Sequence, residues 1–161
     1  MSFWKNPALL RLWFADVLSK SGTEISRVAL PLTAVLVLNA TPAQMGLLGI
    51  ARSLPNLLFG LLAGVWVDRV KRGPILMAAD VGRALLLGSI PLAAWLGWLT
   101  FTQIVIVVFA TATLTIFFTL GAVSILPALV DGDELVDANS KFQLTGSILA
   151  VAGPPIAGPL V

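Results

Sequence analysis

The sequence predicts an all-α membrane protein with five transmembrane helices. Of its residues, 58% are hydrophobic and only 11% are charged, whereas soluble domains carry about 25% charged residues. The mean hydropathy is +0.97. A chain of 161 residues has no interior large enough to hide so many apolar side chains. We therefore expect lipid to be the solvent for much of the surface.

A short charged run between two long apolar segments supports this prediction. The run Asp68-Arg69-Val70-Lys71-Arg72 follows segment 44–67, which contains one charge, and precedes segment 74–98, which contains two. Each segment exceeds the roughly 20 helical residues that cross a hydrocarbon layer of about 30 Å. Backbone groups cannot go unpaired in lipid, so these segments are expected to be helices rather than open strands. The charged run is then a loop at the membrane surface.

The same pattern predicts the other elements of a single bundle that covers residues 1–161. Residues 39–43 and 99–101 hold no charge, while the second loop is basic, so the positive-inside rule places the N-terminus and the second loop in the cytoplasm. The fourth loop, 131–141, falls on the same side although it is mainly acidic. The predicted spans are 10–38, 44–67, 74–98, 102–130 and 142–161.

The last predicted span reaches Val161 with no cap, charge or interfacial aromatic residue after it. We therefore expect the chain to stop inside its fifth helix and to be the front part of a longer protein. The partner expected from this interpretation is the missing C-terminal half.

The absence of certain residue types from the sequence excludes several functions. The chain has no Cys and no His, which excludes thiolate or imidazole metal ligands, thiol redox chemistry and a histidine-dependent triad. It also lacks a phosphate-binding Gly-x-x-x-x-Gly-Lys-Ser/Thr loop. The net charge of +2 is too small and dispersed to suggest nucleic acid. We expect neither an enzyme nor a metal or cofactor site.

The first helix carries a charged stripe. Asp16, Lys20, Glu24 and Arg27 fall within a sector of roughly 80° at about 100° per residue. Central charges cost at least about 2.5 kcal/mol each on insertion scales, so the stripe should face a bundle or a watery cavity. Asp16 and Lys20 can alternatively reach the cytoplasmic interface. Glu24 and Arg27 lie deeper, either on a substrate or ion pathway or as a structural ion pair.

The second loop carries residues that resemble a known motif. Gly64, Asp68, Arg69 and Arg72 match Gly-x-x-x-Asp-Arg-x-Gly-Arg-Arg, with Lys71 where many members have Gly. On this motif the sequence resembles the major facilitator superfamily, and within it the macrolide-efflux and siderophore-export proteins. The resemblance extends to Ala29-Leu-Pro31, Asp80-x-x-Arg83, Leu126-Pro-x-Leu-Val130, Asp133-Glu-Leu-x-x-Ala-Asn139 and, in part, Gly153-Pro154-Pro155-Ile156-Ala157-Gly158.

The resemblance implies a major-facilitator-type N-terminal bundle of the cell membrane. It implies a secondary transporter that exports a small organic molecule, similar to a drug or siderophore, by alternating access with proton coupling. Asp16, Glu24 and Arg27 would then serve the transport pathway. The alternatives are a non-transporting membrane scaffold or subunit, and a nonfunctional truncated fragment.

The resemblance also assigns a gate to the second loop, formed by Gly64, Asp68, Arg69 and Arg72. The loop charges can also act as topology determinants alone. Asp80 and Arg83 would either extend the gate network or form a local ion pair, since they are i, i+3 partners. Gly153, Pro154 and Gly158 would bend the fifth helix along a cavity, or form an ordinary kink.

Overall fold

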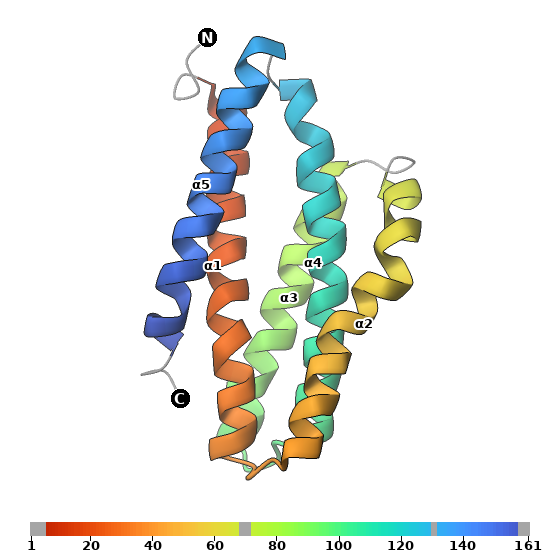
Figure 1. Ribbon diagram of the computed structural model, residues 1–161, viewed down its shortest axis with the longest axis vertical. Coiled ribbons are helices and arrows are strands. Elements are labelled where there is room, and N and C mark those ends of the chain that lie inside the picture. The colour runs from red at the N-terminus through yellow and green to blue at the C-terminus, as the bar shows by residue number, and fades with distance from the viewer. Residues whose placement is uncertain (1–5, 68–71, 130–131, 158–161) are drawn as a thin grey trace. The chain divides into compact units, whose positions relative to one another are not determined.

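The computed structural model describes the backbone of residues 6–67, 72–129 and 132–157, and its regular elements over these ranges are all helices (Figure 1). The predicted all-α class is therefore confirmed for the described part of the chain. The helices are α1 (Pro7–Leu36), α2 (Pro42–Val67), α3 (Arg72–Trp95), α4 (Phe101–Leu129) and α5 (Gly132–Ala157).

Local capping determines where α2 begins. The Thr41 hydroxyl accepts a hydrogen bond from the Gln44 amide at 3.3 Å, and the Gln44 side chain accepts one from the Thr41 amide at 2.8 Å. This reciprocal pair is a capping box, which satisfies two amides that have no partner inside the helix. Pro42 occupies the first helical position, where its missing amide costs nothing. The uncharged segment 39–43 is thus a tight helix-to-helix turn.

The α3 helix ends through a glycine in the left-handed region. Gly97 has φ of 71°, which a residue without Cβ adopts with little strain. The Trp98 amide donates to the Ala93 carbonyl at 2.9 Å and the Gly97 amide donates to the Ala94 carbonyl at 3.1 Å. These two bonds form a Schellman motif, which caps the last carbonyls of the helix.

The start of α5 corrects one prediction. The segment 131–141 was expected to be a loop, but the helix already begins at Gly132. Acidic residues are favourable in the first turn of a helix, and Asp133 and Glu134 stand there. Lys141 pairs with Asp137 at i, i+4, which also favours helix over this segment. Charge thus marks the polar start of a long helix here rather than a loop.

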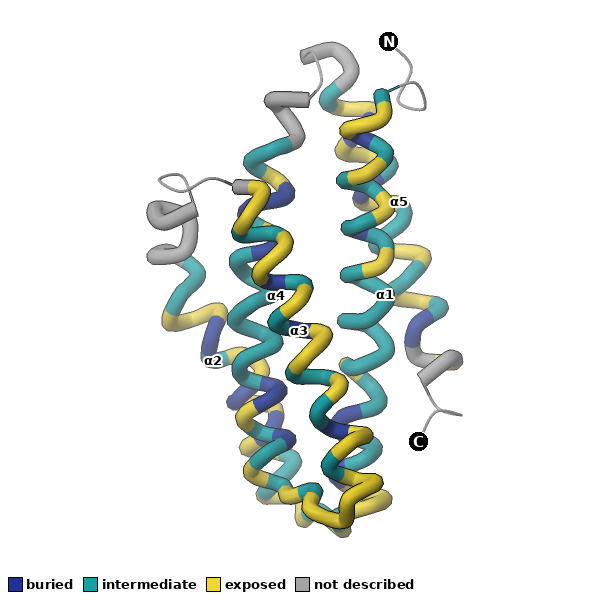
Figure 2. Tube along the Cα trace, turned by 180° about the vertical axis from the view of Figure 1, so that it is seen from behind, coloured by how far each residue is buried: buried dark blue, intermediate teal, exposed yellow. Residues whose placement is uncertain are grey.

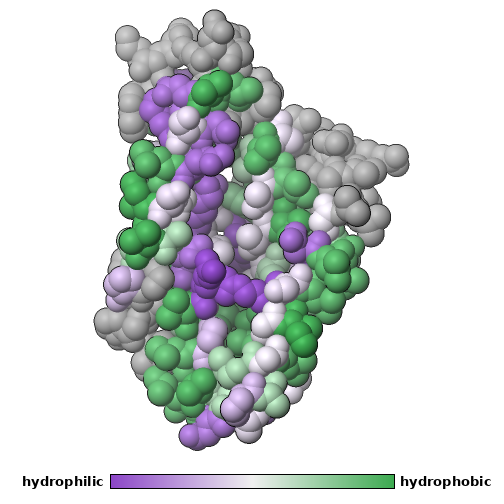
Figure 3. Space-filling view, viewed as in Figure 1, coloured by the Kyte–Doolittle hydropathy of each residue, from purple (hydrophilic) through white to green (hydrophobic). Residues whose placement is uncertain are grey.

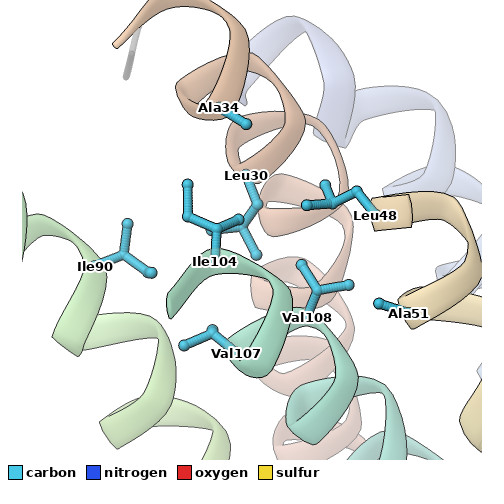
Figure 4. Packing of buried hydrophobic residues seen from close by; sticks show 8 residues of the cluster. All are labelled: Leu30, Ala34, Leu48, Ala51, Ile90, Ile104, Val107 and Val108. Carbon is cyan, nitrogen blue, oxygen red and sulfur yellow. The ribbon is translucent and has the colours of Figure 1, made fainter. Parts of the chain in front are cut away.

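The chain divides into two compact units. The larger unit, 30–121, holds the end of α1, all of α2 and α3, and most of α4. Its core consists of small and branched side chains from these four helices, seen together in Figure 4. The buried members are Leu30, Ala34, Leu48, Ala51, Ile90, Ile104, Val107 and Val108.

The other unit contains residues 1–29 and 122–161, and its helices are the first part of α1, the end of α4 and α5. A smaller cluster of Leu9, Ala138 and Phe142 joins α1 to α5. The two helices lie side by side and run in the same direction (Figure 1). In Figure 2 the buried positions form short patches along the helices, separated by exposed ones.

Two described helical segments are long and apolar enough to cross a membrane. They are Gly73–Trp95, with a mean hydropathy of 1.6, and Phe101–Ile125, with 2.4. Only 17% and 28% of their apolar windows are buried, unlike the core helix of a soluble protein. The five predicted transmembrane helices are therefore not confirmed as a set. The charges in α1 and the acidic start of α5 lower the hydropathy of those helices.

Ile104 provides a test of the core of the larger unit. It is fully buried, with 0% exposure, so Ile104→Ala should leave a cavity and lower the free energy of unfolding by about 2–5 kcal/mol. Ile106→Ala on the same helix is the matched control, because Ile106 is 59% exposed. The free energy of unfolding of both variants can be measured by denaturant unfolding in detergent micelles. Equal losses from the two substitutions would contradict the assigned core.

Candidate functional site

The charged stripe of α1 consists of two ion pairs in succession. The Lys20 ammonium lies 2.7 Å from an Asp16 carboxylate oxygen. One turn further along, an Arg27 guanidinium nitrogen lies 3.6 Å from Glu24 Oε2. Acid and base alternate along the stripe, so its formal charges cancel. Such pairing lowers the cost of holding charge in an apolar helix.

The four side chains differ in exposure. Asp16 is buried, at 4%, although Lys20 is partly exposed. The Glu24 side chain is 19% exposed and that of Arg27 is 56% exposed. Glu24 Oε2 is buried and has no hydrogen-bond partner among the described residues. Burial of a carboxylate oxygen without a hydrogen-bond partner costs free energy, because no water replaces the missing bond.

The stripe packs against α5 within a single unit of the chain. The Trp13 indole donates a hydrogen bond to Thr145 Oγ1 at 3.2 Å, and the Lys20 ammonium donates to the Phe142 carbonyl at 3.4 Å. Figure 3 shows hydrophilic side chains as a band along α1 and α5, flanked by hydrophobic ones. We call this contact the α1–α5 seam and define it by Trp13, Lys20 and Glu24 of α1 with Thr145, Gly146 and Gly153 of α5.

Glycines on α5 allow the seam to close. A Cβ atom at Gly146 would lie 3.4 Å from the Lys20 ammonium, and one at Gly153 would lie 2.7 Å from Glu24 Cβ. The first neighbour is the end of a flexible side chain. The second is attached directly to the α1 backbone, so α5 is as close to α1 at Gly153 as the absence of a side chain permits.

Gly153 was predicted as part of a bend in the fifth helix. In the structure it lies within α5, which continues as a helix through Pro154 to Ala157. Gly158 lies outside the described residues. The sequence did not indicate that Gly153 touches Glu24, because glycine carries no side chain whose pattern could signal a partner.

Among the described residues, Arg83 of α3 is buried as well as Asp16. Arg83 pairs with Asp80 of the same helix, donates to Thr115 Oγ1 of α4 at 3.3 Å, and places its guanidinium 4.7 Å from the centre of the Phe118 ring. The Arg83 side chain is only 7% exposed. Asp80 and Arg83 therefore form the predicted i, i+3 pair, and Arg83 also fastens α3 to α4 within the larger unit.

Thr115 and Phe118 were not predicted as partners of Arg83. A threonine within a strongly apolar helix is the one available signal, since hydroxyls in such helices commonly bond to their own backbone. The Thr115 hydroxyl also donates to the Thr111 carbonyl at 2.7 Å and can still accept from Arg83.

The gate residues are only partly described. Gly64 lies in α2 and Arg72 is the first residue of α3. Asp68 and Arg69 lie outside the described residues, as does the side chain of Arg72. The gate therefore stays a prediction.

Two curated transporters are similar to this chain over almost its whole length. The chain is 33% identical to the uncharacterized MFS-type transporter y4rN of Sinorhizobium fredii, a match that covers 99% of this chain and 39% of that protein. It is 26% identical to the uncharacterized MFS-type transporter YkuC of Bacillus subtilis, a match that covers 95% of this chain and 35% of that protein. The chain thus spans well under half the length of these relatives. No family model matches it, and no solved structure matches it.

The described residues form helices, and two of these are apolar and long enough to cross a membrane, which fits a membrane protein. Within that class, the chain is related to MFS-type transporters, so its predicted resemblance to the major facilitator superfamily is confirmed.

The Arg83 contacts lead to a stability prediction. Arg83→Lys should lower the free energy of unfolding by about 1–3 kcal/mol, because an ammonium cannot bond to Asp80 and Thr115 and also stack on Phe118. Arg11→Lys, at an exposed position of α1, is the control and should change stability little. Unfolding of each variant in micelles measures the loss.

A double-mutant cycle isolates the contact with the aromatic ring. Phe118→Leu should lower the free energy of unfolding less in the Arg83→Lys background than in the unchanged protein, with a coupling energy of about 0.5–2 kcal/mol. Additive losses would show that the ring contributes nothing to holding Arg83.

Proposed function

We propose that this chain forms the N-terminal helices of a secondary active transporter that works by alternating access. The observation that carries the proposal is the charge-balanced stripe of α1, which lies in a chain with only 11% charged residues that is related to MFS-type transporters. Ionisable residues inside membrane segments are rare and mark substrate, ion or proton pathways. Transport requires no covalent chemistry, and we propose no enzymatic activity.

The proposed direction is export of a small organic molecule out of the cell, with protons as the coupling ion. Glu24 is the proposed proton acceptor, because one of its oxygens is buried without a hydrogen-bond partner and its ionic contact with Arg27 is long, at 3.6 Å. Protonation of Glu24 would remove its charge and weaken that contact. Asp16 is the second candidate acid, and Arg27 lines the same pathway.

The second loop is the proposed gate. Asp68, Arg69 and Arg72 supply charges at a membrane surface, where an ion pair that forms in only one access state would shift the balance between the two states. The Arg83 cluster would keep α3 and α4 together as the gate moves, because its contacts link the two helices. The other helices of the transporter would supply the opposite side of the gate.

The proposed orientation places the N-terminus and the second loop in the cytoplasm of a multi-pass cell-membrane protein. The chain has no Cys, so a single cysteine introduced at position 40 or 70 is the one thiol within residues 1–161. With Ala40→Cys and Val70→Cys, an impermeant maleimide applied to intact cells should label position 40 and leave position 70 unlabelled until the cells are opened. Labelling of both from the same side would contradict this topology.

Glu24→Gln tests the proposed proton acceptor in the whole transporter. Glutamine keeps the size of the side chain but cannot release a proton, so transport driven by a proton gradient should lose most of its pH dependence. The measurement is uptake into inverted vesicles across a pH series. The matched control is Asp137→Asn, which removes an exposed acid on α5 and should leave the pH dependence unchanged.

The alternative structural role of the Glu24–Arg27 pair has a different outcome. In that case Glu24→Gln would lower the folding yield, and the surviving protein would keep its normal pH profile. That result would remove Glu24 from the coupling mechanism.

A further inference from the structure

Gly153 has an environment that no other described glycine shares. A Cβ atom at this position would lie 2.7 Å from Glu24 Cβ, 3.4 Å from the Glu24 carbonyl carbon and 3.6 Å from its Cα. A Cβ at Gly82 would also meet a close neighbour, at 2.9 Å, but that neighbour is the methyl end of Leu114, which can rotate away. At Gly153 the obstacle is part of the α1 helix itself.

The close approach places α5 against the base of the Glu24 side chain. Gly153 is itself buried, and the Glu24 side chain keeps only 19% of its surface exposed. Since the Glu24 side chain leaves α1 at this close contact, the separation of the two helices there governs how much water reaches its carboxylate. Even a methyl group on α5 would force this separation to increase.

Within this unit, the described charges next to Glu24 belong to its own helix. Arg27 lies 3.6 Å away, and Lys20, one turn earlier, is engaged by Asp16. From Phe142 onward α5 contains no ionisable residue, and neither does the end of α4 that belongs to the same unit, 122–129. Within this unit α5 therefore acts on Glu24 through steric contact and exclusion of water, not through a charge of its own.

We infer that Gly153 is a positioning residue for Glu24: its missing side chain lets α5 close over the Glu24 carboxyl group in the α1–α5 seam and limits the access of water to it. The role in coupling rests on the proposed function, in which Glu24 accepts the transported proton. The closure itself follows from the contact and does not depend on transport.

Accessibility of position 24 tests the closure. Glu24→Cys introduces the chain's single cysteine, and its rate of reaction with a small water-soluble maleimide is measured on the whole protein in micelles. Adding Gly153→Ala should raise the rate about tenfold, because overpacking of this kind alters the balance between closed and open states by about 1.4 kcal/mol. An unchanged rate in folded protein would overturn the inference.

Gly22→Ala is the matched control. Gly22 also lies within a helix of the same unit, but a Cβ there would meet nothing within 4 Å. It carries the same gain in helix propensity as Gly153→Ala without the steric clash. The labelling rate of Glu24→Cys should therefore stay the same with Gly22→Ala, and an equal increase from both substitutions would contradict a specific role for Gly153.

A second pair of variants keeps the test decisive if Gly153→Ala folds poorly. Because the nearest obstacle is Glu24 Cβ, Glu24→Gly should restore the folding yield of Gly153→Ala, whereas Glu24→Ala, which keeps Cβ, should not. Restoration by neither variant would show that the close contact lies elsewhere.

The pH profile of transport separates positioning from a merely structural role. In vesicles, Gly153→Ala should shift the profile and Gly22→Ala should leave it in place, since only the former changes the surroundings of Glu24. If Glu24→Gln leaves the profile unchanged, proton coupling at Glu24 fails. The labelling result would still decide whether Gly153 closes the seam.

Discussion

Charge in an apolar helix must be compensated, and this requirement shapes both units of the chain. In α1, Asp16 and Lys20 compensate each other at 2.7 Å, and Glu24 and Arg27 do so at a longer distance of 3.6 Å. In α3, Arg83 is neutralised by Asp80 and further held by α4. Burial of each charge costs free energy, so a charge is tolerated inside the structure only where a compensating partner is within reach.

The two buried clusters differ in how fully they are satisfied. Arg83 has an acid, a hydroxyl and an aromatic ring as partners, which together fasten two helices. Glu24 has a long ionic contact, and its buried Oε2 has no hydrogen-bond partner in the described part of the chain. The first arrangement fastens two helices through several contacts, whereas the second holds Glu24 through a long ionic contact with its own helix.

Small residues determine where a polar stripe can meet another helix. Without a hydrophobic driving force between helices in lipid, association depends on close packing and hydrogen bonds. Gly146 and Gly153 provide that closeness opposite Lys20 and Glu24, and Trp13 adds a hydrogen bond to Thr145. The same face of α1 therefore supplies the charges and the principal contact with α5. Movement of α5 relative to α1 would change the surroundings of the charges directly.

The sequence by itself determined the helical class, the uncharged turns near 39–43 and 99–101 and the charged stripe, because these depend on local patterns. The stripe followed from the spacing of Asp16, Lys20, Glu24 and Arg27, and the Asp80–Arg83 pair followed from its i, i+3 separation. The loop predicted over 131–141 was wrong, since α5 already begins at Gly132 and acidic residues stand in its first turn.

Only the tertiary structure decided which helices face these charges. Thr115 and Phe118 meet Arg83 across two helices, and Gly153 meets Glu24 between helices far apart in the chain. Periodicity identifies the face of a helix but not the helix that packs on it. A glycine carries no side chain to mark a contact, so its part in closing the seam depends on the separation of two backbones, which is a property of the packed structure alone.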